Sequence, residues 1–196
     1  MKTWRLTLTL ALLTLGAALI PTFVVYAQNP MTLRWDKAAP FPEPEEELYG
    51  ITAGGKMYVI GGFSEGGKAA PGMVYEYDAA TDKWTKKKPI PVPVHHQAQA
   101  ELNGKIYIFG GCQRPLTGAG AGGWAPVDNS WEYDPATDTY KALAPMPGKR
   151  CSAIAEQVNG KFYVIGGGTI QDKTGELALF GDRPQRILAK IGRAHV

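Results

Sequence analysis

One nine-residue pattern occurs three times in this chain, and it limits the folds that the chain can adopt. The copies are GKMYVIGGF at 55–63, GKIYIFGGC at 104–112 and GKFYVIGGG at 160–168. Their double glycines, at 61–62, 110–111 and 166–167, are 49 and 56 residues apart. A repeat with this period predicts an array of similar supersecondary units that bury their apolar faces against one another.

Each copy contains an apolar run, KMYVI, KIYIF or KFYVI, that is typical of a buried strand. Asn103-Gly104 and Asn159-Gly160 precede two of the runs and predict hairpins from an earlier strand. YEYDAATDKW at 75–84 and WEYDPATDTY at 131–140 follow the first two copies, and Asp134-Pro135 predicts a turn between two further strands. Each unit is therefore predicted to contain four antiparallel strands.

A strand that ends in Gly-Gly, then Tyr-Asp, then an aromatic residue some six positions later resembles the kelch motif when it recurs at this period. The resemblance covers residues 33–168 and implies an all-β fold, a kelch-type β-propeller with four-stranded antiparallel blades. Blade 1 is expected at 48–93, blade 2 at 94–147 and a partial blade 3 at 148–190. About two and a half blades make an incomplete ring, because propellers have about four to eight.

Residues 1–27 predict a secretory signal peptide. Lys2 and Arg5 precede the uncharged run 6–27, which ends in VYA and so offers small residues for cleavage before Gln28. The alternative is an uncleaved anchor, because a run of this length nearly spans a bilayer. Pro21 and the cleavage site favour cleavage, which predicts a secreted or periplasmic protein with no membrane contact after the leader is removed.

Both flanks of the repeat carry predictions of their own. Residues 28–47 are expected to form a linker and an orphan outermost strand, because Trp35 precedes Trp84 by 49 residues. Kelch propellers often close their ring with such an N-terminal strand. The third copy lacks a Tyr-Asp segment, and its third strand is expected from near Ile187. Residues 191–196, IGRAHV, are expected to be a non-native tail, because codons that encode them match a sequencing adapter; a divergent natural tail is the alternative.

Charge and histidine placement exclude some functions. The chain has 21 basic and 18 acidic residues, and the two basic residues of the leader leave 19 − 18 = +1. A nearly neutral chain without a basic stripe is not expected to bind nucleic acid. No cofactor and no metal is expected. Adjacent His95 and His96 would point to opposite sides of a strand and would not easily share one ion.

The candidate site lies where the Gly-Gly strands end. The loops that follow them and the connections between blades should open on one side of the sheets, called here the loop-bearing face. Aligning the lysine of each GK puts Glu46, His95 and Cys151 at one ring position. Cys112 and Cys151 are expected on this face of adjacent blades, within reach of a disulfide. Candidate ligand-binding residues are Arg114, Trp124, His95, His96 and Arg150.

Three functions follow from these features. The repeat favours a non-enzymatic exported propeller that binds a protein or carbohydrate ligand through its loop-bearing face. The alternative is a carbohydrate-active enzyme similar to the periplasmic kelch sialic acid mutarotases (epimerases), in which Arg150 and Glu46 would be candidate catalytic residues at the channel mouth. A copper oxidase similar to galactose oxidase is less favoured, because its Tyr-Cys crosslink and its Tyr and His ligands match no positions here.

Overall fold

The computed structural model describes residues 33–43, 45–64, 68–69, 72–113, 125–170, 177–179 and 189–190. The chain divides into two units, Met1–Lys37 and Ala38–Val196. The described part of the first unit, 33–37, has no regular secondary structure, and the Arg34 guanidinium pairs with Asp36. The expected signal peptide and tail lie outside the described residues, and the ring-closing strand stays a prediction. No helix long and apolar enough to cross a bilayer occurs in the described ranges.

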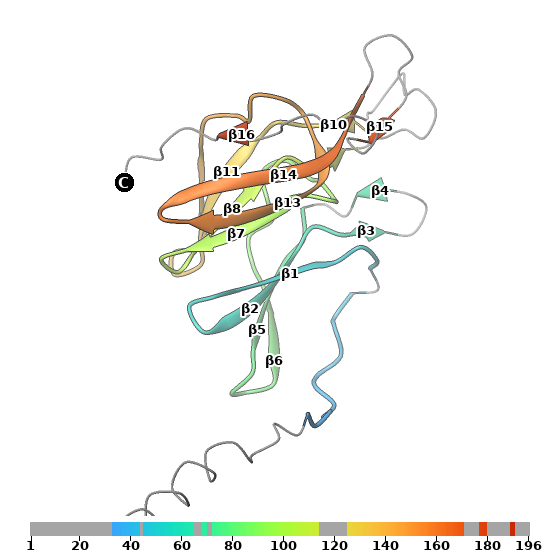
Figure 1. Ribbon diagram of the computed structural model, residues 1–196. Helices are drawn as coiled ribbons and strands as arrows, with labels where there is room; N and C mark the ends of the chain where they lie inside the picture. Colours follow the sequence, from blue (N-terminus) through green and yellow to red (C-terminus); the bar gives the residue numbers. More distant parts are fainter. Residues whose placement is uncertain are drawn as a thin grey trace, which may run out of the picture. The chain divides into compact units, whose positions relative to one another are not determined.

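The first two repeat units each form a four-stranded antiparallel sheet, as predicted (Figure 1). The first sheet has the order β1-β2-β5-β6, and the second has the same order in β7-β8-β11-β12. The bounds in blade 1 are β1 Tyr49–Ala53, β2 Lys56–Ile60, β5 Val74–Asp78 and β6 Lys83–Lys86. Those in blade 2 are β7 Ala98–Leu102, β8 Lys105–Phe109, β11 Ser130–Asp134 and β12 Thr139–Ala142.

The third unit begins with a longer hairpin of β13 (Cys151–Val158) and β14 (Lys161–Ile170). β16 (Ala189–Lys190) pairs with β14 and occupies the place of a third strand, close to the start expected at Ile187. Lys190 lies opposite Tyr163, as Glu76 lies opposite Tyr58 in the first sheet. The third copy therefore follows the same register as the other two.

Short hairpins extend the loops that follow the double glycines. β3 (Phe63–Ser64) pairs with β4 (Lys68–Ala69), and β9 (Cys112–Gln113) pairs with β10 (Ala125–Pro126). In the third unit, β15 (Leu177–Leu179) pairs with the far end of β14. These small hairpins lie at one end of the sheets and form part of the loop-bearing face (Figure 1).

The core lies between successive sheets. One cluster joins Ile60 and Val74 of the first sheet to Ile106, Ile108 and Tyr133 of the second. A second cluster joins the other face of the second sheet to β13 and β14; its members include Ala98, Tyr107, Phe109, Ala153, Phe162 and Val164. Each sheet thus buries its apolar residues against a neighbour, as the repeat predicted.

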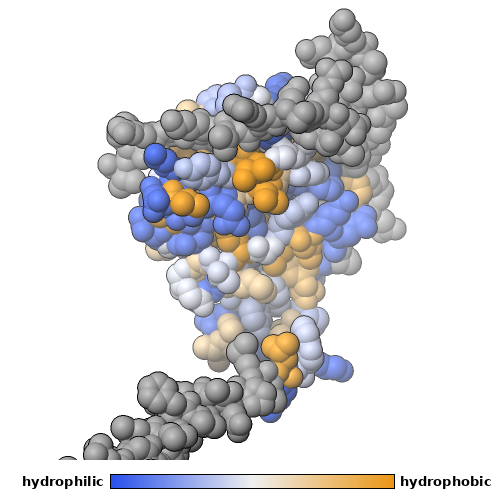
Figure 2. Space-filling model, in the orientation of Figure 1, coloured by the Kyte–Doolittle hydropathy of each residue, from blue (hydrophilic) through white to orange (hydrophobic). Residues whose placement is uncertain are grey.

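The outer side of β13 and β14 is apolar as well. Alternate residues of β13 are buried against the second sheet, while Ile154, Val158 and Ile165 are 62%, 50% and 46% exposed. Figure 2 shows apolar patches among hydrophilic ones on the side of the molecule where these strands face the viewer. The alternation gives β13 one face against blade 2 and one face toward solvent.

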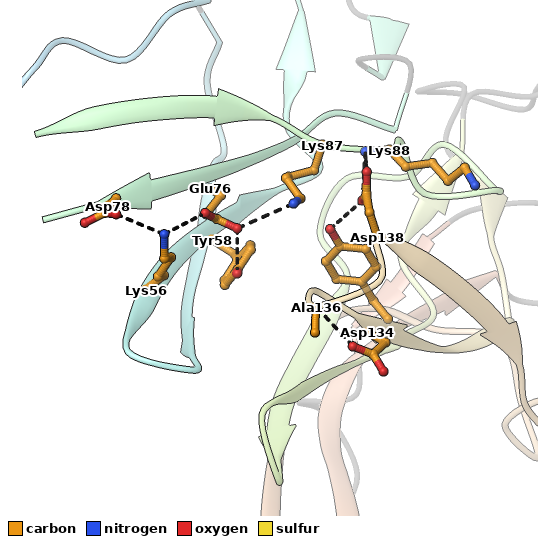
Figure 3. Close-up of polar contacts among 10 residues, drawn as sticks. Lys56, Tyr58, Glu76, Asp78, Lys87, Lys88, Asp134, Ala136 and Asp138 are labelled. Atoms are coloured by element: carbon orange, nitrogen blue, oxygen red, sulfur yellow. Dashed lines mark hydrogen bonds and ion pairs between the residues drawn. The ribbon is translucent and has the colours of Figure 1, made fainter. Parts of the chain in front are cut away.

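A buried polar set recurs in the first two sheets and explains part of the repeated sequence. The Tyr58 hydroxyl donates to Glu76 (2.8 Å), and Lys56 forms ion pairs with Glu76 and Asp78 (Figure 3). In the second sheet Tyr107 donates to Glu132 (3.1 Å) and Lys105 pairs with Glu132 (2.6 Å). The GK lysine and the Tyr-Glu pair are therefore structural.

Two local predictions about turns are confirmed. Asn103 and Gly104 have φ values of 55° and 77°, as a tight hairpin turn requires. Asp134 accepts a hydrogen bond from the Ala136 amide (3.0 Å), so its side chain closes the turn before β12. The same bond links Asp78 to the Ala80 amide (2.9 Å) in blade 1.

The first prediction concerns Glu132. Glu132→Gln is expected to lower the free energy of unfolding at pH 7 by roughly 1–2 kcal/mol, because Lys105 loses the closer of its two charged partners, Glu132 and Asp134. The bond from Lys105 lowers the pKa of the Glu132 carboxyl in the folded protein. A lowered folded pKa gives stability above the unfolded pKa of about 4.3, and that stability is lost as pH falls through the folded value. Urea titrations should therefore show the deficit shrinking below about pH 4.

Tyr107→Phe is the matched control for this prediction. It removes the 3.1 Å hydroxyl bond and leaves the ion pair between Lys105 and Glu132 in place. Its loss of stability should be smaller and should keep the wild-type acid dependence. An equal deficit for Glu132→Gln at pH 7 and pH 3 would show that the charge of Glu132 is not what stabilises the sheet.

The second prediction concerns Gly111, where the chain leaves β8. Its φ is +108°, and a Cβ there would lie 2.7 Å from Val94 Cβ and 3.0 Å from the His95 carbonyl oxygen. Gly111→Ala should cost about 2–4 kcal/mol from strain and overpacking. In Gly104→Asn the new Cβ meets nothing within 4 Å among the described residues, and Asn tolerates a positive φ, so thermal melts should show little change.

Candidate functional site

The connections between blades meet the loop-bearing face at equivalent positions. Isolated bridges join Glu46 to Phe63 and His95 to Cys112, and Cys151 pairs with Gly168 in the third hairpin. In each pair the second residue directly follows the two glycines of the repeat. Glu46, His95 and Cys151 therefore occupy one ring position, as the alignment of the GK lysines predicted.

The next residue along each connection has a left-handed backbone. Glu47, His96 and Ser152 have φ values of 56°, 55° and 56°. This conformation is uncommon for residues other than glycine, and its recurrence at one position in three units shows that the fold imposes it. The strand alternation that would direct successive side chains to opposite sides is interrupted here.

This backbone overturns the expectation for His95 and His96. Their Nδ1 atoms are in contact instead of facing opposite sides, because the positive φ of His96 turns its side chain back toward His95. Glu47 Oε2 lies 3.4 Å from His95 Nδ1 and 3.1 Å from His96 Nδ1. Two imidazoles from blade 2 and one carboxylate from blade 1 therefore converge.

The two histidines differ in their surroundings. The His95 side chain is 3% exposed and the His96 side chain 27%. Burial, together with the nearby His96, lowers the pKa of His95 to about 4. The His95 ring is therefore neutral at pH 7, and it packs edge-on against Phe63 with ring centroids 5.1 Å apart.

Arg150 connects blades 2 and 3. Its guanidinium donates to the Gly166 carbonyl oxygen (2.7 Å), while its own carbonyl accepts from the Gly111 amide (3.0 Å). Burial lowers its pKa, although the group stays charged. Glu46, the other candidate catalytic residue, is exposed in front of β1, with its backbone bonded to Phe63. Arg114 and Trp124 lie outside the described residues.

A disulfide joins Cys112 and Cys151, with the Cα atoms 5.3 Å apart. It links the first residue of β9 to the first residue of β13, so blades 2 and 3 are covalently connected at the loop-bearing face. Both cysteines of the chain take part, which leaves no free thiol.

A groove of about 370 Å³ lies along the first strands of the three units, β1, β7 and β13. Neither amide atom of Gln99, which lines it, has a hydrogen-bond partner among the described residues, although both atoms are buried. The Glu101 carboxylate accepts from the Gly104 amide (2.6 Å), which fixes its position. The polar residues that line the groove are Thr52, Gln99, Glu101, Glu156 and Gln157.

The groove and Glu47 were missed by sequence reasoning. A groove built from three strands of three blades has no signature within any one strand. One signal was available: Thr52, Glu101 and Gln157 each lie one residue before the end of their strand, so the repeat places them at equivalent positions. Polar residues at the same position in successive inner strands point to a shared surface.

The third prediction concerns the disulfide. Replacing both cysteines with serine should lower the free energy of unfolding by about 4 kcal/mol, because the bond closes a loop of 39 residues in the unfolded chain. Urea unfolding of the wild type with reductant should approach that of the double variant. The double variant itself should not respond to reductant, and equal stability of both proteins without reductant would contradict the expectation.

Comparison with known proteins agrees with this architecture. The family model of the KLHDC2/KLHL20/DRC7 Kelch-repeats domain matches residues 20–182. No curated protein matches the chain. Among solved structures, the chain is similar to the one titled "Structure of YjhT", with a TM-score of 0.56 and 25% identity. The match covers 67% of this chain and 37% of the YjhT chain. The chain described here therefore spans well under half the length of that protein. The chain belongs to the Kelch-repeats domain family.

Proposed function

We propose that this kelch-repeat protein is an exported binding module that holds a polar ligand, a glycan in the first instance, in the groove along β1, β7 and β13, with the loop-bearing face at the other end of these strands. The observation that carries the proposal is the buried amide of Gln99, unpartnered among the described residues, in a groove that three blades share. A buried amide without a partner costs about 1–3 kcal/mol, and a turn of the Gln99 side chain into the groove would let a ligand hydroxyl satisfy it.

The composition of the groove favours a sugar. Amide, carboxylate and hydroxyl side chains together offer both donors and acceptors, which suits hydroxyl groups that can do both. Glu101 is already held by the Gly104 amide, so part of the surface is fixed before a ligand arrives. The volume of about 370 Å³ falls in the usual range for small-molecule sites and suits one or two sugar rings.

Two features support export. The leader at 1–27 has the charge, apolar run and cleavage motif of a signal peptide. The disulfide between Cys112 and Cys151 belongs to an oxidising compartment, because thiols are kept reduced in the cytosol. A secreted or periplasmic location fits both features.

A mutarotase of the sialic acid type is the second candidate. The Glu101 carboxylate lines the groove in a fixed position, and mutarotation needs positioned acid and base groups. Arg150 and Glu46 would then bind or polarise the sugar at the mouth. A galactose-oxidase-like site is disfavoured, because both cysteines of this chain are in the disulfide and neither is available for a Tyr-Cys crosslink.

The fourth prediction tests the binding role. The full chain is applied to an array of neutral and sialylated oligosaccharides, and the affinity for the best glycan is then measured by calorimetry. Gln99→Ala should weaken binding by roughly tenfold, which corresponds to the loss of about 1.4 kcal/mol. Its thermal stability should not fall, since the amide has no partner to lose within the described chain. Lys141→Ala, on the exposed strand β12, is the matched control.

The possible outcomes of this experiment distinguish a glycan-binding module from an enzyme and from a protein-binding module. Binding that depends on Gln99 supports the proposal, and catalysed exchange of sialic acid anomers, followed by NMR, would assign the protein to the enzyme class instead. Binding only to a protein ligand, or glycan binding that Gln99→Ala leaves unchanged, would overturn the assignment of the groove.

A further inference from the structure

Glu47, His95 and His96 have the arrangement of a set of metal ligands. The three side chains each direct one ligand atom to a common point, and these atoms all lie within 4.8 Å of one another. No other group of three or more histidine, cysteine or acidic residues within the described residues does so. The cluster shares no residue with the lining of the Gln99 groove.

The distances agree with the coordination of one small cation. Tetrahedral zinc with bonds of about 2.0–2.1 Å separates its ligand atoms by about 3.3 Å. Glu47 Oε2 is 3.4 Å from His95 Nδ1 and 3.1 Å from His96 Nδ1. The two Nδ1 atoms are closer together, and a small rotation of the more exposed His96 ring would open that separation. A cation between the rings would also remove the need for either Nδ1 to carry a proton.

The backbone holds this set in place without the ion. His95 is fixed on both sides, because its amide donates to the Cys112 carbonyl oxygen (3.1 Å) and its carbonyl accepts from the Cys112 amide (2.8 Å). His96 is fixed by the Ser152 amide, which donates to the His96 carbonyl oxygen (2.8 Å). The disulfide of Cys112 lies directly beside this bridge. A ligand set held by the fold loses little conformational entropy when an ion binds.

Charge and exposure suit a divalent metal with one open position. Imidazole nitrogens are the commonest protein ligands of such metals. Glu47 adds a single negative charge, and its side chain is 39% exposed. Three protein ligands with a solvent-facing side leave a fourth position for water or for an oxygen of a bound molecule, as in zinc sites that are not purely structural.

We propose that Glu47 Oε2, His95 Nδ1 and His96 Nδ1 bind one divalent transition-metal ion, zinc in the first instance, between blades 1 and 2 at the loop-bearing face. The ion joins two blades that are otherwise held together here by packing and by the hydrogen bond that the Gln97 side-chain amide donates to the Ile60 carbonyl oxygen (2.7 Å). A ligand oxygen can complete the coordination at the open position.

The fifth prediction tests this site with the full chain, tag removed, treated with EDTA and kept free of reductant so that the disulfide stays closed. Titration with zinc chloride in a calorimeter should show one ion per chain, and cobalt(II) should give the visible absorption of a four-coordinate site. His96→Asn and Glu47→Gln should each weaken zinc binding by at least about tenfold. Asn is chosen at position 96 because it tolerates the left-handed backbone.

Glu45→Gln is the matched control, because Glu45 lies on the same segment and is not part of the cluster. It should change zinc affinity by less than about twofold. Circular dichroism and melting in EDTA establish that each variant folds. Zinc binding that survives both His96→Asn and Glu47→Gln would overturn the proposal. So would a folded wild-type protein that binds no zinc at micromolar concentrations, or cobalt absorption that shows thiolate ligation.

Discussion

The apolar contact between successive sheets is the interaction on which the rest of this structure depends. Ile60 and Val74 of one sheet meet Ile106 and Tyr133 of the next, and all four side chains are fully buried. Because side chains alternate along a strand, a shift by one residue would turn each of these side chains away from its partner sheet. The packing therefore fixes the register of the second strand in every unit and the edge at which its Gly-Gly segment leaves the sheet.

Fixed register has consequences at both ends of the strands. Toward the hairpin end, it places the tyrosine hydroxyl, the glutamate and the GK lysine together, so that the buried polar groups are paired. Toward the other end, it brings each blade connection beside the residue that follows the double glycine. The repeated residues maintain this framework, and the side chains at the blade connections differ from unit to unit.

Features set by local sequence patterns could be predicted, whereas features that depend on an unusual backbone or on several units together could not. The four-stranded sheets of the first two units, the two Asn-Gly hairpins and the equivalence of Glu46, His95 and Cys151 in three units followed from local patterns and spacing. The convergence of His95 and His96 did not follow, because alternation along a strand applies only while the backbone is extended. The groove around Gln99 was also missed, since it exists only after three strands from three units have come together.

The left-handed residues at the loop-bearing face have a further consequence. Glu47, His96 and Ser152 share one backbone conformation but have a carboxylate, an imidazole and a hydroxyl as side chains. Backbone hydrogen bonds of the preceding residue hold each connection, so the side chain at this position contributes little to the fold. Divergence among related proteins can then proceed one unit at a time, with the recognition chemistry of the ring exchanged residue by residue while the scaffold stays intact.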